Sequence, residues 1–156
     1  MKLYRFSPIS SEQKCQQALE YIAEQLRGLS AKVMDESPPI NTLKIFAHYS
    51  DEYALLKNWA DSLGEHDDDG SKTSYYVKPI KPMTVAGEPI EYVGIRTPDP
   101  YRAQVGCGDY VVGNYDELKK KYLGNSPWIR EVEHPRYEML ELFHPDIDVL
   151  GYIVKD

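Results

Sequence analysis

The stretch LKIFAHYSDEYALLKNWADSLG, residues 43 to 64, decides the fold class of this chain. Its first seven residues place Leu43 and Ile45 on one side and Lys44 on the other, the period of two that is typical of a β-strand. The apolar residues that follow are spaced three and four apart and stop at Gly64, as expected of an amphipathic helix with a glycine at its end. The stretch therefore predicts a strand followed directly by a helix.

The next part of the chain is rich in short apolar runs. We expect a loop over EHDDDG, residues 65 to 70, because it is acidic and ends in glycine. Strands are expected over residues 75 to 80 and 90 to 97, joined through a turn around Ala86-Gly87-Glu88. Together with the first strand and helix, these runs predict one unit of the form strand, helix, strands.

The same order of elements returns near Gly106. A short strand there is followed by a helix that begins after Asn114 and ends at Gly124. Strands are then expected in WIREVE (128–133), in RYEMLELF (136–143) and in LGYIV, where a short terminal helix is the alternative. The helix ends SLG (62–64) and YLG (122–124) recur at the same place in each unit, so we expect an internal structural repeat.

The N-terminal region has a different character. Ser10 with Gln13 forms a capping-box pattern, and apolar residues recur at helical spacing until Gly28, where we expect the helix to end. The adjacent prolines of DESPPIN, residues 35 to 41, separate this helix from the first strand. We therefore expect one structural domain: an N-terminal helical extension over residues 1–40, then residues 41–156 with units at about 41–100 and 105–156.

Composition limits the classes of partner. The 156 residues are 42% hydrophobic, enough for one core, and the net charge of −7 disfavours nucleic acid, because the phosphate backbone would be repelled. No segment has the roughly 20 apolar residues that span a bilayer, and the start lacks a signal-peptide pattern, so a cytoplasmic protein without membrane contact is expected. Cys15 and Cys107 form no paired motif, which disfavours a disulfide framework.

Four passages carry a resemblance to a known family: LKIFAHY with its helix, PIEYVGIRTPDP, GDYVVGNYDEL, and LELFHPDID with the apolar segment after it. The chain resembles the glyoxalase-like, or vicinal oxygen chelate (VOC), superfamily, and is most similar to its YecM-like branch. The resemblance implies an α+β fold in which two βαβββ units form one curved mixed sheet, preceded by an N-terminal helical extension. It implies a scaffold, and a scaffold does not fix a function.

The superfamily holds a divalent metal with one side chain from each of four strands. Carried onto this sequence in register, those positions fall on Lys44, Arg96, Cys107 and Leu142. Lysine and arginine are not ordinary ligands of a divalent metal, and leucine is not a ligand at all. The departure from the pattern argues against the standard metal site.

Strand alternation predicts which other side chains point into the hollow on the concave side of the expected sheet. His48 follows Lys44, Tyr92 precedes Arg96, Asp109 follows Cys107, and Arg136 and Glu138 precede Leu142. One hypothesis is a displaced metal site made of His48, Asp109 and Glu138, since an imidazole and two carboxylates suit zinc, manganese or iron. A second is a buried network that pairs these acids with nearby bases.

A third hypothesis is a site for a small anion. Its candidate ligand-binding residues are Lys44, Tyr92, Arg96, Cys107 and Arg136. Ammonium and guanidinium groups in a concave site recognise carboxylate or phosphate. Arg102 fits either the mouth of a pocket or the open surface.

The sequence leaves three functions open. We expect a protein that binds a small polar or anionic ligand in the hollow of the sheet, with a divalent metal compatible but not implied. The alternatives are a metal-dependent lyase, isomerase or dioxygenase, and an interaction protein without a pocket. A homodimer is compatible with this family but no residue demonstrates one.

Overall fold

A computed structural model describes residues 1–155. Its helices are α1 (Glu12–Val33), α2 (Ser50–Leu63) and α3 (Tyr115–Tyr122). Its strands are β1 (Ile40–Phe46), β2 (Gly64–Asp67), β3 (Ser74–Pro79), β4 (Met83–Val85), β5 (Glu88–Ile90), β6 (Tyr92–Arg96), β7 (Gly106–Tyr110), β8 (Ile129–Val132), β9 (Met139–His144) and β10 (Ile147–Val154).

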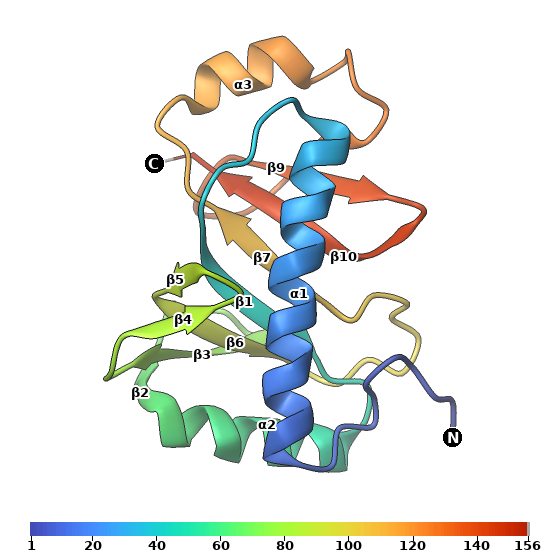
Figure 1. Ribbon diagram of the computed structural model, residues 1–156, viewed down its shortest axis with the longest axis vertical. Coiled ribbons are helices and arrows are strands. Elements are labelled where there is room, and N and C mark those ends of the chain that lie inside the picture. Colours follow the sequence, from blue (N-terminus) through green and yellow to red (C-terminus); the bar gives the residue numbers. More distant parts are fainter. Residues whose placement is uncertain (156) are drawn as a thin grey trace.

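Eight of these strands form one sheet in the order β2-β3-β6-β1-β7-β10-β9-β8 (Figure 1). The first half of that sheet is the unit β1-α2-β2-β3-β6, and the second half is the unit β7-α3-β8-β9-β10. The small hairpin β4–β5 is inserted into the first unit. The halves join where β1 and β7 pair antiparallel. Two βαβββ units in a single curved mixed sheet, with a helix before them, confirm the predicted fold class.

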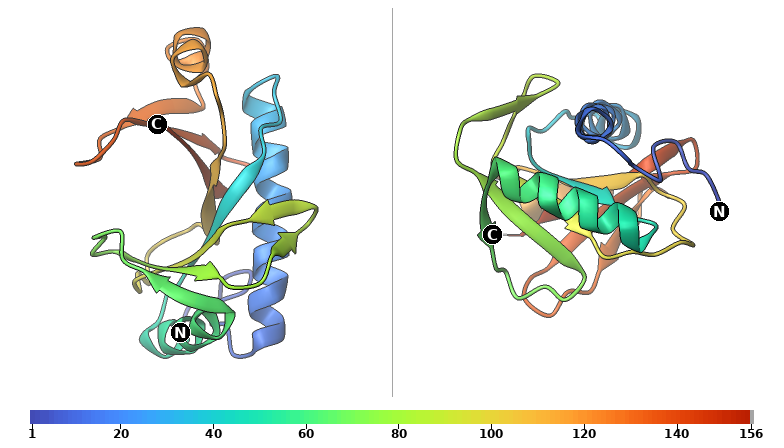
Figure 2. Two further views of the ribbon diagram at one scale, coloured as in Figure 1. Left: turned by 90° about the vertical axis from the view of Figure 1, so that its left-hand side faces the viewer. Right: turned by 90° about the horizontal axis from the view of Figure 1, so that it is seen from below.

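The three helices cover one side of the sheet and leave the other side open. Figure 2 shows the strands curving away from α1, with α2 near one end and α3 near the other. The apolar residues Leu43 and Ile45 of β1 face the helices and are fully buried in the main core. Lys44 and Phe46 therefore lie on the concave side, as the alternation in the sequence predicted.

Helix α1 is longer than the sequence suggested. Ser11 caps its start by accepting a hydrogen bond from the Lys14 amide, and the helix continues through Gly28 to Val33. Leu29 and Val33 prolong the buried stripe beyond the glycine, so packing against the sheet outweighs the weak helix propensity of Gly28. The expected helix end at Gly28 was wrong.

Two strand boundaries also differ from the prediction. EHDDDG was expected to be a loop, but residues 64–67 form the edge strand β2, which pairs with β3. An edge strand exposed on both sides has no apolar pattern to reveal it. RYEMLELF was expected to be a strand from residue 136, but β9 begins at Met139. The turn at Ala86 and Gly87 is confirmed, and both residues have positive φ, as a tight two-residue hairpin requires. It joins the short strands β4 and β5, which were not expected, while β3 and β6 pair as predicted.

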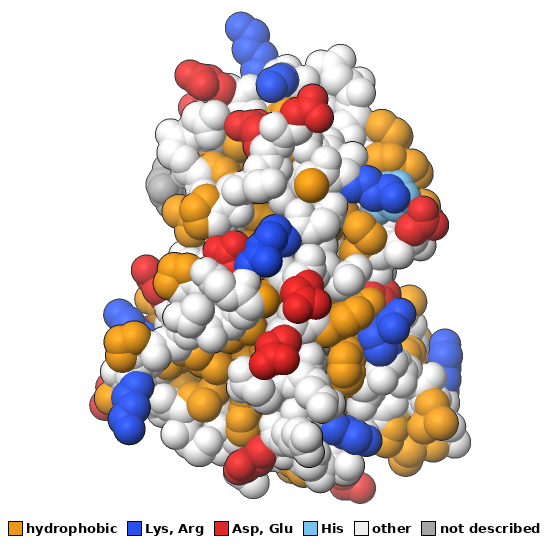
Figure 3. Space-filling model, viewed as in Figure 1, with side chains coloured by type: hydrophobic (Ala, Val, Ile, Leu, Met, Phe, Trp, Pro, Cys, Tyr) orange, Lys and Arg blue, Asp and Glu red, His pale blue; other side chains and the backbone are white. Residues whose placement is uncertain are grey.

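The helix-covered side carries charges of both signs. In Figure 3, acidic and basic side chains alternate over α1 and the elements beside it and do not gather by sign. Within residues 1–155, no helix is both long and apolar enough to cross a bilayer.

Candidate functional site

The concave side of the sheet is built around the middle of β1. Lys44 lies opposite Cys107 of β7 and Gly94 of β6, and Phe46 lies opposite Arg96. Gly94 leaves room for the Tyr76 ring of β3, because a Cβ atom there would lie 2.7 Å from the ring. The Lys44 ammonium rests over that ring, 4.9 Å from its centre. Residues from four strands therefore meet on this side.

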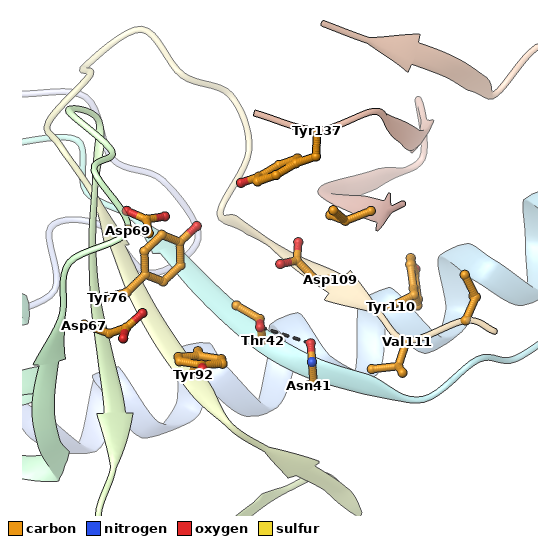
Figure 4. Close-up of a pocket in the computed structure, with 12 residues that line it drawn as sticks. Asn41, Thr42, Asp67, Asp69, Tyr76, Tyr92, Asp109, Tyr110, Val111 and Tyr137 are labelled. Atoms are coloured by element: carbon orange, nitrogen blue, oxygen red, sulfur yellow. Dashed lines mark hydrogen bonds between the residues drawn. The ribbon is translucent and has the colours of Figure 1, made fainter. Parts of the chain in front are cut away.

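A pocket of about 300 Å³ opens on the concave side around Thr42 and Asp109 (Figure 4). The hydroxyl ends of Tyr76 and Tyr137 point toward each other from opposite halves of the molecule, with Asp109 beside them. The residues that line the pocket are Asn41, Thr42, Asp67, Asp69, Tyr76, Tyr92, Asp109, Tyr110, Val111, Val112, Tyr137 and Val154. The two halves of the chain thus build this pocket together.

Asp109 is the innermost acid of the pocket. Burial raises its pKa to about 6, and the nearby Lys44 ammonium opposes that shift only in part. The carboxylate receives no hydrogen bond from residues 1–155 and has no cation within ion-pair distance there. A carboxyl group in this setting changes its charge near neutral pH.

Two guanidinium groups lie at the other end of β1. Those of Arg96 and Arg102 rest over the Phe46 ring, 5.4 and 5.1 Å from its centre. Like Lys44, they form no ion pair within the described part of the chain. The Nε atom of Arg102 is buried and has no hydrogen-bond partner there. The structure thus places Arg102 over the concave side, a choice that the sequence alone left open.

Cys107 lies in the floor beneath these cations. Its side chain is 3% exposed and packs with Phe46 and Leu150. Burial raises the pKa of the thiol to about 11, against the attraction of Lys44. Burial thus favours the neutral thiol, and the side chain packs in the floor of the hollow.

Glu141 is a buried acid that the sequence interpretation missed. Its carboxylate accepts a hydrogen bond from Tyr152, 2.7 Å away, and forms an ion pair with Arg130. We expected Leu142 to face the hollow, which was wrong: Leu142 lies opposite Gly151, is fully buried and packs in the core on the helix side. A shift of one residue turns every side chain of a strand to the other face. The missed signal was the alternation of Glu141 and Phe143 with Leu142.

His48 lies outside the hollow. Strand β1 ends at Phe46, so alternation no longer decides where His48 points. Its ring lies against Tyr4, with a centroid distance of 3.7 Å, and its two nitrogens contact the Ser7 hydroxyl and the Arg102 carbonyl oxygen. Both nitrogens are occupied by these contacts, so the predicted role of His48 as a metal ligand in the hollow was wrong.

Glu138 and Arg136 also lie away from the floor of the hollow. Glu138 pairs with Lys119 of α3, whose ammonium lowers the pKa of the carboxyl against a smaller effect of burial. Arg136 is exposed in the loop before β9 and donates to the Asp69 carbonyl oxygen at the mouth. Within residues 1–155, no group of three His, Cys, Asp or Glu side chains lies close enough to hold a metal ion. The predicted set of His48, Asp109 and Glu138 therefore does not come together.

The comparisons with known proteins concern the fold. No protein-family model and no curated protein sequence matches the chain. A solved structure described as Protein EC4020 is 14% identical over 100% of this chain and 93% of its own, with a TM-score of 0.68. That similarity spans both units and the N-terminal helix. The fold is glyoxalase-like.

Two epimerase structures are more distant. A variant of Streptomyces coelicolor methylmalonyl-CoA epimerase, in complex with 2-nitronate-propionyl-CoA, is 15% identical over 75% of this chain and 96% of its own, with a TM-score of 0.41. The Mycobacterium tuberculosis methylmalonyl-CoA epimerase is 12% identical over 74% of this chain and 86% of its own, with a TM-score of 0.40. At such distances neither protein's substrate transfers to this chain.

Proposed function

We propose that this protein binds a small polar molecule in the hollow of its sheet and holds an anionic group of that molecule with Lys44 and Arg96. Arg102 lies over the same aromatic ring as Arg96 and adds a second guanidinium group. Guanidinium and ammonium groups recognise carboxylate and phosphate through charge-assisted hydrogen bonds. Tyr92 adds a hydroxyl at the neighbouring pocket.

The observation that carries this proposal is the set of cations without partners. Lys44, Arg96 and Arg102 lie on one concave surface, and none forms an ion pair within residues 1–155. Arg130, another cation of the concave side, is already paired with Glu141. The Tyr76 and Phe46 rings offset part of the desolvation of these cations, and a bound anion would add the counter-charge that they lack.

The first prediction concerns Arg96. We expect small carboxylates or phosphates to raise the melting temperature of the purified protein, and Arg96→Ala to weaken their binding about 10- to 100-fold, the cost of losing one charged hydrogen bond. Titrations followed by thermal unfolding and calorimetry, at fixed ionic strength, measure both effects. Lys120→Ala removes the same charge from an exposed position of α3 and should leave the response unchanged.

Arg96→Lys shows whether a weaker response of Arg96→Ala comes from the lost charge or from a protein that no longer folds. This variant should keep part of the affinity, because the charge remains while the planar fork is lost. The proposal is contradicted if no carboxylate or phosphate stabilises the wild-type protein, or if Arg96→Ala responds as the wild type does.

Three finer assignments belong with this proposal. We assign the chain to the YecM-like branch on the four sequence passages and on the N-terminal helix α1, which packs on the same sheet. We also keep the cytoplasmic location and the homodimer as predictions. A metal-dependent reaction would need a ligand set other than His48, Asp109 and Glu138, because these three lie in separate parts of the molecule.

A further inference from the structure

The pocket beside the cations has the opposite electrostatic character. Every charged residue that lines it is an aspartate: Asp67, Asp69 and Asp109. Three tyrosines that reach into it, Tyr76, Tyr92 and Tyr137, come from β3, β6 and the loop before β9. The negative face of an aromatic ring attracts cations, and carboxylates add to that attraction. Two of these rings already hold cations of the chain, because the Lys44 ammonium lies over Tyr76 and that of Lys78 over Tyr92. The three aspartates and the ring of Tyr137 are the groups that suit a further, cationic group of a ligand.

Asp109 is the group that points to a ligand. It projects into the cavity between Tyr137 and Thr42 (Figure 4). A carboxylate has about four acceptor positions, and none of those on Asp109 is filled by a hydrogen bond from the described residues. The hydroxyl of Thr42, its neighbour across the strands, donates instead to Asn41. A donor from outside the chain would satisfy this acid.

The geometry points to a ligand that carries both charges: we propose that the molecule held by Lys44 and Arg96 has an ammonium group, which enters the tyrosine-lined pocket and donates to Asp109. This inference rests on the proposed anion-binding function and adds the second charge. Lys44 is paired with Cys107, and Asp109 is the second residue along the same strand, so the two are diagonal neighbours. Such positions are roughly 7–8 Å apart at their Cα atoms.

A Cα separation of this size favours a small ligand. A ligand with a carboxylate and an amine a few bonds apart can reach both sites at once, which describes a small amino acid. A simple carboxylate would fill the cationic side and leave Asp109 without a donor. A simple amine would fill the pocket and leave the arginines without an anion. Selectivity for the zwitterion comes from satisfying both.

The test compares three probes that share a chain of four carbons: 4-aminobutanoate, butanoate and butylamine. Glycine and 6-aminohexanoate extend the series to shorter and longer separations. With wild-type protein at pH 7.5, we expect calorimetry to show the best amino acid of the series binding at least 10-fold more tightly than the carboxylate of matched length. Butylamine is the weakest of the three matched probes, because it lacks the group that Lys44 and Arg96 hold.

Variants assign each charge to its site. Asp109→Asn keeps the shape of the side chain and should abolish the preference for the amino acid over butanoate; because a negative charge beside Lys44 is removed, butanoate itself should bind at least as tightly as to the wild type. Tyr137→Leu removes one ring from the partly exposed mouth and should weaken only the probes that carry an amine. Tyr101→Leu changes a tyrosine that is 91% exposed and outside the pocket, and should change none of them. A melting curve for each variant shows that it is folded.

The outcomes separate this inference from the proposed function. If butanoate binds as tightly as the amino acids, or if Asp109→Asn keeps the preference for the amine, the ammonium site is overturned while anion binding stands. If no probe with a carboxylate binds, both proposals fail. If butylamine binds as tightly as the amino acids and Asp109→Asn abolishes that binding, the pocket takes a cation alone, and the proposed second charge is wrong.

Discussion

Asp109 and Glu138 were assigned the same role from the sequence, but their surroundings separate them. Glu138 forms an ion pair with Lys119 on the helix side of the sheet, and this contact lowers the pKa of its carboxyl. Asp109 lies in the pocket, where burial raises its pKa to about 6. The residue type is therefore a poor guide to charge state, because the partner and the solvent decide it.

The pH dependence of stability tests this difference. Because folding raises the pKa of Asp109 from its ordinary value, the folded state binds the proton more tightly, and ionised Asp109 destabilises the protein above pH 6. That cost is relieved as the pH falls through about 6 toward the ordinary value near 4. We expect Asp109→Asn to be more stable than the wild type by on the order of 2 kcal/mol at pH 7.5, and by about half of that at pH 5.

Urea unfolding of both proteins at the two pH values measures this effect. The difference between the proteins is the relevant quantity, because other groups also contribute to the pH dependence of each one. Equal differences at pH 7.5 and pH 5 would show that Asp109 keeps an ordinary pKa in the folded state.

At the scale of elements, the contact between α1 and β7 depends on small residues. Gly106 and Gly108 face the helix, and Cβ atoms there would meet Ile22 and Leu26. A Cβ on Gly108 would also lie 2.6 Å from the Thr42 carbonyl oxygen of β1. This oxygen belongs to the backbone and cannot move away as the end of a flexible side chain can. The glycines therefore let the helix lie close to the centre of the sheet, where β1 and β7 join the two halves.

Gly108→Ala tests this close approach. We expect it to lower the free energy of unfolding by roughly 1–3 kcal/mol, the usual cost of overpacking a core. Gly113→Ala is the matched control, because a Cβ there meets nothing within 4 Å. Denaturant unfolding of the two variants and the wild type measures the difference. Equal stabilities of the two variants would contradict the packing of α1 against β7 described above.

At the scale of the whole molecule, the N-terminal segment is tied to the sheet through one buried acid. Glu52, at the start of α2, is 2% exposed. Its carboxylate accepts hydrogen bonds from the Ile9 and His48 amides, each 2.6 Å away, and from the Ser7 hydroxyl. The N-terminal segment and the start of α2 are thereby held together beside the end of β1.

Glu52→Ala should lower the free energy of unfolding by about 3 kcal/mol, because it leaves at least two buried amides without acceptors. Glu117→Ala is the control: it removes the same group from an exposed position in the first turn of α3 and should change stability by less than about 0.5 kcal/mol. Urea unfolding measures both. Similar losses in the two variants would mean that the buried contacts of Glu52 add little.

The hollow itself exists only at this largest scale. Lys44 and Arg96 come from the first unit, while Asp109 and Tyr137 come from the second. At the mouth, Arg136 of the second unit donates to the Asp69 carbonyl oxygen of the first. The first unit carries Lys44 and Arg96 for the anion, and the second carries Asp109 for the ammonium group, so both charges of the ligand are recognised only by the paired units.

The sequence by itself determined the order of the elements, the repeat of the units and the inward position of Lys44, Arg96 and Cys107. The order, the repeat and the position of Lys44 follow from periodicity and helix ends, which depend on neighbours along the chain. The positions of Arg96 and Cys107 were implied by the resemblance to the VOC superfamily. Alternation could not place His48, because β1 stops at Phe46. The register carried over from the family was wrong by one residue in β9, so it placed Leu142 in the hollow, where Glu141 lies.

Only the tertiary structure decided which charged groups stay unpaired. It joins Glu138 to Lys119 and Glu141 to Arg130, and it leaves Asp109, Arg96 and Arg102 without ion pairs within residues 1–155. The physical reason is that a charge pair depends on distances of a few ångströms between residues far apart in sequence. Those distances are fixed by how the sheet curves and how its two halves meet, and no local pattern of residues encodes them.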